Sequence, residues 1–89
     1  MKIEISKFGD ILVSRPAGRE AFHIIMSYLQ PTSLEEVIEL DFSGVSVVAP
    51  SWLDEVYTEL LNHFGSQRVK ILPTTNESVI KSLEVIQSE

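Results

Sequence analysis

The sequence predicts a small α/β domain with the element order β-β-α-β-α-β-α and a mixed four-stranded sheet. Two observations predict it. Short runs alternate apolar and polar residues, as half-buried strands do, and longer runs repeat apolar residues every three or four positions, as helices do. Because these helical runs separate the later strands, we expect right-handed βαβ crossovers. The 89 residues allow one domain, spanning 1–89, and 44% hydrophobic residues supply its core.

A β-hairpin is expected at the beginning of the chain. Ile3 and Ile5 alternate with polar residues, which is typical of a half-buried strand. Gly9-Asp10 then offers a turn, and residues 11–13 form a second apolar run. The pattern therefore predicts two strands joined by a reversal of the chain.

The first helix is expected to follow Arg15-Pro16. The residue before a proline avoids the helical region, whereas proline itself suits the first helical position. Pro31 is expected to end this helix. Its buried face is predicted from the spacing of Ala17, Ala21, Ile24, Ile25, Tyr28 and Leu29.

The middle of the chain predicts a central strand and a second helix. Residues 36–42 carry apolar side chains on both faces of a strand, and the apolar run 45–49 indicates a connection that packs against the body. Ser51 followed by Asp54 resembles a capping box, and Gly65 suits the end of the helix. The helix repeats its apolar residues at Leu53, Val56, Tyr57, Leu60, Leu61 and Phe64.

The last part of the chain predicts a strand and a helix. Residues 68–72 alternate as a strand does, and Thr74 followed by Glu77 gives a second capping signal. The helix that follows is expected to bury Val79, Ile80, Leu83 and Ile86.

Composition disfavours several classes of function. Seven basic and thirteen acidic residues give a net charge of −6, and the basic residues are dispersed, so nucleic-acid binding is not expected. The absence of cysteine excludes disulfides, thiolate metal sites and a cysteine nucleophile. Residues 1–6 lack the apolar run of a signal peptide, and no stretch is long enough to span a bilayer. We therefore expect a cytoplasmic protein without membrane contact.

The residues also give little support for an enzyme. His23 and His63 fall on separate predicted helices at positions expected to be exposed, and no spacing suggests a Ser-His-Asp arrangement. No glycine-rich phosphate loop is present, so no cofactor is expected. Asp41, Asp54 and Glu55 could in principle gather at the carboxyl edge of the sheet as a carboxylate cluster, but we do not expect a metal site.

Two segments carry a resemblance to a known family. Residues 40–45 (LDFSGV) and 50–55 (PSWLDE) resemble the central signature of STAS domains, the fold of anti-sigma factor antagonists and of the cytosolic tails of sulfate transporters. In the antagonists, aspartate, a phosphorylated serine and glycine stand where this chain has Ala49, Pro50 and Trp52, and Ser51 aligns with a second serine. The variant is more similar to STAS-like families of unassigned function. The resemblance implies helices packed mainly on one face of the sheet.

The resemblance also implies a docking role for the start of the second helix. Its relatives switch protein partners, among them ATP-binding regulatory kinases, so the expected partner-binding residues are Pro50, Ser51, Trp52, Asp54 and Glu55. Each has a structural alternative. Ser51 is a phosphorylation site or a plain helix cap, Trp52 an interface anchor or a core residue, and the two acids a recognition patch or a solvated first turn.

Three hypotheses follow for the function. The first is a non-catalytic, regulatory protein-interaction module. The second is a small-ligand or divalent-cation domain at a strand-edge crevice, formed by Asp41, Ser43, Ser51 and Asp54. The third is a module that forms homodimers.

Overall fold

The computed structural model describes residues 1–29 and 36–88, so the predicted helix stop at Pro31 lies outside the described residues. The strands are β1 (Lys2–Glu4), β2 (Ile11–Leu12), β3 (Ile38–Asp41), β4 (Val47–Val48) and β5 (Val69–Ile71). The helices are the 3₁₀ turn η1 (Ile5–Phe8), α1 (Arg15–Tyr28), α2 (Pro50–Leu53), the π-helical segment η2 (Asp54–Thr58), α3 (Glu59–Phe64) and α4 (Glu77–Gln87). The small α/β domain is confirmed.

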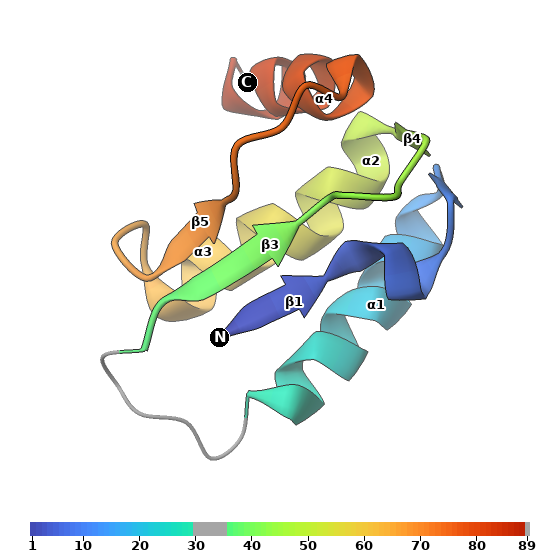
Figure 1. Ribbon diagram of the computed structural model, residues 1–89. Coiled ribbons are helices and arrows are strands. Elements are labelled where there is room, and N and C mark those ends of the chain that lie inside the picture. The colour runs from blue at the N-terminus through green and yellow to red at the C-terminus, as the bar shows by residue number, and fades with distance from the viewer. Residues whose placement is uncertain (30–35, 89) are drawn as a thin grey trace.

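The strands form two small parallel sheets instead of the predicted mixed four-stranded one. One sheet has the order β1-β3-β5 and the other pairs β2 with β4. β1 lies beside β3 (Figure 1) and β2 pairs with β4 in the other sheet, so β1 and β2 do not pair with each other. The predicted hairpin is therefore wrong.

The turn signal at Gly9-Asp10 serves a different purpose from the one predicted. Gly9 has φ +138°, which suits glycine, but the turn leads into a strand of the second sheet instead of back along β1. The Asp10 carbonyl accepts the backbone N–H groups of Ser46 and Val47 at 2.9 and 3.1 Å, and its Oδ1 accepts that of Ser46 at 3.0 Å. Asp10 thus joins β2 to the neighbouring strand, a long-range contact that local turn chemistry does not reveal.

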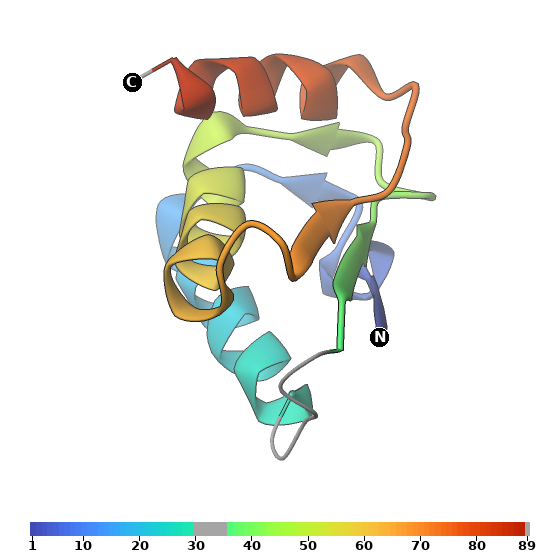
Figure 2. The ribbon, with the colours of Figure 1, turned by 90° about the vertical axis from the view of Figure 1, so that its left-hand side faces the viewer.

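The helices leave one face of the three-stranded sheet uncovered. Figure 2 shows α1 and the continuous α2-η2-α3 on one side of this sheet, with α4 across its end. Ile3, Leu40 and Ile71 pair across the strands on the covered face. On the other face the paired residues are Lys2, Glu39 and Lys70, whose charges alternate in sign. The alternation along each strand therefore separates the core from a charged open face.

Helix α1 buries a face rotated from the predicted one. Ala21, Ile25 and the C-terminal Leu29 are buried as predicted, but Gly18 and Phe22 join them, while Ile24 and Tyr28 are exposed. Gly18 explains the rotation, because it lets the helix approach the backbone of α2 at Trp52. Three residues of the predicted apolar face, Ala17, Ile24 and Tyr28, therefore remain on the outside of α1.

The second predicted helix is confirmed along its length, although a π-helical segment interrupts it. Leu53, Val56 and Leu60 are fully buried, and the other residues of the predicted stripe pack partly against the core. The chain leaves the helix at Gly65, which has φ +86°. The last strand and helix are also confirmed, although Ile80 is exposed while Val79, Leu83 and Ile86 pack in or against the core. The N-cap of α4 is Asn76, not the predicted Thr74, because the Asn76 side chain accepts hydrogen bonds from the backbone N–H groups of Ser78 and Val79.

Candidate interaction surface

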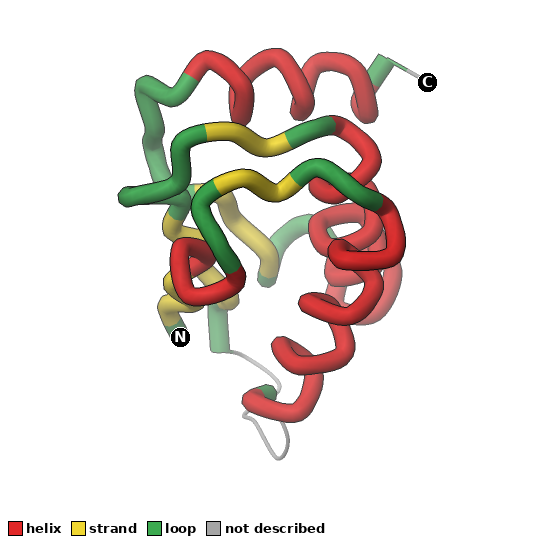
Figure 3. The backbone as a smooth tube through the Cα atoms, turned by 90° about the vertical axis from the view of Figure 1, so that its right-hand side faces the viewer, coloured by secondary structure: helices red, strands yellow, loops and turns green. Residues whose placement is uncertain are grey.

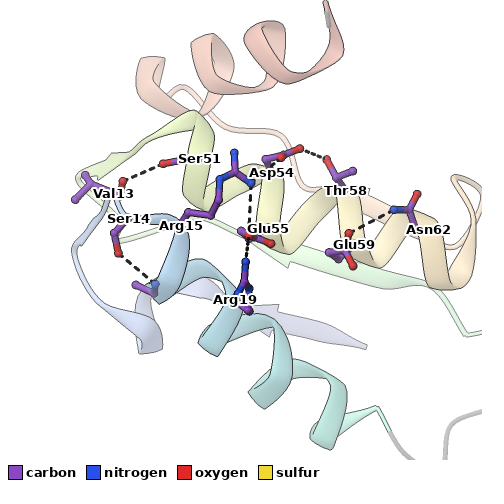
Figure 4. Close-up of polar contacts among 11 residues, drawn as sticks. Val13, Ser14, Arg15, Arg19, Ser51, Asp54, Glu55, Thr58, Glu59 and Asn62 are labelled. Carbon is purple, nitrogen blue, oxygen red and sulfur yellow. Dashed lines mark hydrogen bonds and ion pairs between the residues drawn. The ribbon is translucent and has the colours of Figure 1, made fainter.

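Helix α2 begins without the capping box that the sequence suggests. Its N-cap residue is Ala49, which offers no side-chain oxygen, and Pro50 occupies the first turn. The Ser51 hydroxyl instead donates to the carbonyl oxygen of Val13 at 3.1 Å (Figure 4). Ser51 therefore ties the helix start to the residue that follows β2.

Trp52 is a core residue. Its side chain is 1% exposed and lies among the buried residues of the hydrophobic cluster. The hypothesis of a half-exposed indole that anchors a partner is therefore wrong. The Trp52 backbone contacts α1 where Gly18 allows close approach, and this neighbour lies 34 positions away in the sequence, so a helical wheel of α2 does not show it.

Asp54 and Glu55 are engaged by two arginines of α1. Arg15 contacts Asp54 at 3.0 Å and Glu55 at 3.5 Å, and Arg19 contacts Glu55 at 3.2 Å (Figure 4). Two acids and two bases give this cluster no net charge. The alternative of an acidic recognition patch is therefore not supported, because the cluster is neutral and its four side chains join α1 to η2.

Hydrogen bonds lower the pKa of two carboxyl groups. The Thr58 hydroxyl donates to Asp54 Oδ1 at 2.7 Å and, followed by the Arg15 guanidinium, lowers the pKa of Asp54 against the opposing effect of partial burial. Asp54 in turn raises the pKa of Arg15. At the end of β3, the backbone N–H of Ser43 donates to Asp41 Oδ1 at 2.9 Å and lowers the pKa of Asp41.

The structure brings Asp41 and Ser43 together but separates them from Ser51 and Asp54, the other residues of the predicted ligand crevice. Asp41 points to the open face of the sheet, where Lys2 lies 3.7 Å away, whereas Asp54 contacts α1 on the helical side. Ser51 contacts Val13 instead of either acid. Within residues 1–29 and 36–88, no three carboxylate or imidazole groups lie close enough to hold a metal ion. The predicted site is therefore not assembled.

The two histidines are exposed, as predicted. The rings of His23 and His63 both lie beside the Phe22 ring, with centroid distances of 5.7 and 5.4 Å. They cover the edge of the core and contact no serine or carboxylate that could form a nucleophilic triad among the described hydrogen bonds.

An exposed apolar face lies on the β2-β4 ribbon, and the sequence pattern did not predict it. The side chains of Ile11, Val13 and Val47 are 64%, 50% and 42% exposed. Ile11 and Val47 are register partners, and Val13 follows Ile11 by two residues, so all three lie on the outward side of the ribbon. We call these three residues the ribbon face. The sequence indicates this face only through two short apolar runs. The register between the two strands is needed to show which of their residues point outward.

The ribbon face adjoins the predicted docking segment. Ala49 N–H donates to the carbonyl oxygen of Leu12 at 2.8 Å, which holds the residue before Pro50 against β2. The hydrogen bond from the Ser51 hydroxyl to the Val13 carbonyl oxygen adds a second contact between the helix start and this part of the chain. Pro50 and Ser51, both partly exposed, therefore border the ribbon face, while the neighbouring Trp52 is buried in the core.

Comparison with known families agrees with this architecture. A family model described as "STAS-like domain of unknown function (DUF4325)" matches residues 18–79. The chain is a STAS-like domain and belongs to this family. No curated protein and no solved structure was found to match it. The match includes both segments that carry the resemblance, 40–45 and 50–55.

Within the part of the chain that the structure describes, every helix is too short or too polar to cross a lipid bilayer.

Proposed function

We propose that this STAS-like domain is a non-catalytic regulatory module that binds a protein partner through the ribbon face and the adjoining Pro50 and Ser51. The observation that carries the proposal is the exposure of three aliphatic side chains, Ile11, Val13 and Val47, on two hydrogen-bonded strands. The first partner class to test is an ATP-binding regulatory kinase of the kind that anti-sigma factor antagonists bind.

The grouping of these side chains matters more than their number. Single apolar residues are common on protein surfaces, whereas a contiguous apolar patch with a polar rim is characteristic of an interaction site. The rim is available here, because Ser14, Arg15 and Ser46 are exposed beside the three side chains in sequence. Because the Arg15, Arg19, Asp54 and Glu55 cluster is neutral, apolar contact and not attraction to a basic surface would supply the affinity.

A non-catalytic role is supported by the state of the carboxylates near this surface. General acid catalysis at neutral pH needs a carboxyl group with a raised pKa. The pKa of Asp54 is lowered instead, by Thr58 and Arg15, and the carboxylate of Glu55 is held between two guanidinium groups. These groups therefore act as structural ion pairs in the proposal.

The proposal is tested by partner capture from a native lysate with variants that change only exposed side chains. Val13→Lys combined with Val47→Lys places two charges on the ribbon face and is expected to remove at least one protein from the captured set. Val85→Lys is the matched control, because Val85 is 45% exposed on α4. The captured partner is then purified and its binding measured by titration calorimetry. Equal capture by the parent, the double variant and the control would refute the ribbon face as the docking surface.

A further inference from the structure

The outer edge of β2 carries unpaired backbone groups. The carbonyl oxygens of Asp10 and Leu12 accept N–H groups of the chain around β4, so these two residues turn their backbone groups toward β4. Backbone groups alternate in direction along a strand, so the N–H and carbonyl of Ile11 point to the opposite side. Among the described residues, no strand pairs with β2 on that side.

The corresponding edge of β4 is closed by α4. Figure 3 shows β4 between β2 and α4. The Val48 N–H donates to Ser78 Oγ and the Val48 carbonyl accepts from Ser82 Oγ, each at 3.0 Å. Exposed strand edges readily pair with another chain, and proteins commonly protect them with charge or a covering element. β4 has such a cover, whereas β2 presents the apolar side chain of Ile11 beside its unpaired backbone.

A hollow lies next to this open edge, between β2, η1 and α1. Its volume is about 350 Å³. Apolar side chains of Phe8, Ile11, Ala17 and Ile24 line it, and Trp52 contributes to its wall. Lys7 and Glu20 also line it, so charges of both signs are present. The exposure of Ile24, which the predicted face of α1 would have buried, is explained by its position in this wall.

We propose that the open edge of β2 binds an extended segment of a protein partner, which adds a strand beside Ile11 and places an apolar side chain in the hollow. The inference rests on the proposed interaction function and names the form of the partner. The unpaired N–H and carbonyl of Ile11 select a polypeptide backbone, because only an extended chain offers an acceptor and a donor at that spacing. The apolar lining selects an aliphatic or aromatic side chain at the position that faces α1.

A second copy of this chain fits the same edge less well. Antiparallel pairing of two β2 strands around Ile11 would set Asp10 of the second copy opposite Leu12. Directly opposed residues point to the same face, so that carboxylate would be directed toward the apolar side of the strand, where Leu12 is buried. The charge would lose its hydration without gaining a cation, which disfavours the homodimer as occupant.

The test is selection of binders from a phage-displayed library of random short peptides against the folded domain. We expect enriched peptides with apolar residues at alternate positions. Ile24→Glu should weaken their binding at least about tenfold, because it places a charge in the wall of the hollow. Ala17→Leu, which fills the hollow without a charge, should weaken it similarly, whereas Val85→Lys should leave it unchanged. Ile24 and Ala17 are exposed, and thermal unfolding of each variant verifies its fold.

The position of the bound peptide is read from NMR. A selected peptide should shift the Ile11 amide signal and slow its hydrogen exchange, because an added strand accepts that N–H. Three results would overturn the inference: equal peptide binding by the parent and Ile24→Glu, NMR shifts confined to another face, or no enrichment of peptides from the library. A dimer that forms without peptide, detected by light scattering, would instead assign the edge to a second copy of the chain. The two proposals can fail separately. If the Val13 and Val47 double variant loses the captured partner but Ile24→Glu does not weaken peptide binding, the proposed function stands and only the strand-addition mode is rejected.

Discussion

Gly18 and Trp52 meet so closely that a β-carbon on Gly18 would lie 2.8 Å from the Trp52 carbonyl oxygen. Cβ atoms do not approach backbone atoms to this distance, so any larger residue would push α1 away from α2. This approach explains why α1 turns Phe22 inward and leaves Ile24 outside, and why Trp52 is buried. The hollow, which Ala17 and Ile24 of α1 line, follows from how these helices pack.

Gly18→Ala is therefore expected to destabilise the domain, although alanine is the better helix former. Overpacking at a backbone contact typically costs about 1–3 kcal/mol of the free energy of unfolding, which exceeds the gain in helix propensity. Urea unfolding followed by circular dichroism measures the change. Glu20→Ala, at an exposed position two residues along the same helix, is the control and should change stability by less than about 0.5 kcal/mol. A Gly18→Ala variant as stable as the parent would disprove the close contact.

Trp52 is the only tryptophan, so intrinsic fluorescence reports its environment alone. Because the indole is buried, we expect native emission at short wavelength with little quenching by acrylamide, and a red shift on unfolding. Trp52→Ala should cost about 3–5 kcal/mol, a large part of the stability of a small domain. Strong quenching of the native protein by acrylamide would instead support the hypothesis that Trp52 is an exposed interface anchor.

The stability of the domain should fall in acid partly through Asp54. Its folded-state pKa lies below its ordinary value of 3.8, so its stabilising effect is present above that pH and is lost as the pH falls through the folded-state pKa. The effect is expected to be about 0.5–1 kcal/mol, because the carboxylate is partly exposed. The Asp54→Asn variant should be less stable than the parent at pH 7. In strong acid the unfolding curves of variant and parent should coincide. A constant difference from pH 7 to strong acid would contradict this role.

Ser82 closes the outer edge of β4 and is the buried polar residue of the described core. Ser82→Ala should cost about 1–3 kcal/mol, because it leaves the Val48 carbonyl buried without a donor. Ser78→Ala should speed hydrogen exchange at the Val48 amide, because it removes the acceptor of that N–H. Ser88→Ala, an exposed position after α4, is the control for both measurements. If exchange at Val48 stays unchanged, α4 does not protect this edge.

The elements that could be predicted are those whose evidence is local. Leu53, Val56 and Leu60 recur at helical spacing, and Gly65 ends the helix with positive φ, so periodicity and one turn residue were enough. Residues 40–45 identified the family that the family model shows. These features depend on neighbours within a few positions, which a single sequence displays.

The predictions that were wrong concern residues that contact each other although they lie far apart in the sequence. Arg15 and Asp54 are 39 positions apart, so their ion pair could not be read from the local charge pattern that suggested an acidic patch. The hairpin prediction was wrong for the same reason, because Asp10 bonds to Ser46 across 36 positions and joins β2 to the second sheet. Register between β2 and β4 likewise decides that Val47 points outward and Val48 inward. Candidate surface residues therefore depend on pairing and on helix packing.

Site-specific photo-cross-linking in cells tests the central claim most directly. A photoreactive amino acid placed at Val47, on the ribbon face, should form a covalent adduct with a protein partner on illumination. The same amino acid at Val85, an equally exposed position on α4, should form little or none. Adducts at Val85 but not at Val47, or equal adducts at both, would contradict the assignment of the ribbon face as the surface that binds the partner.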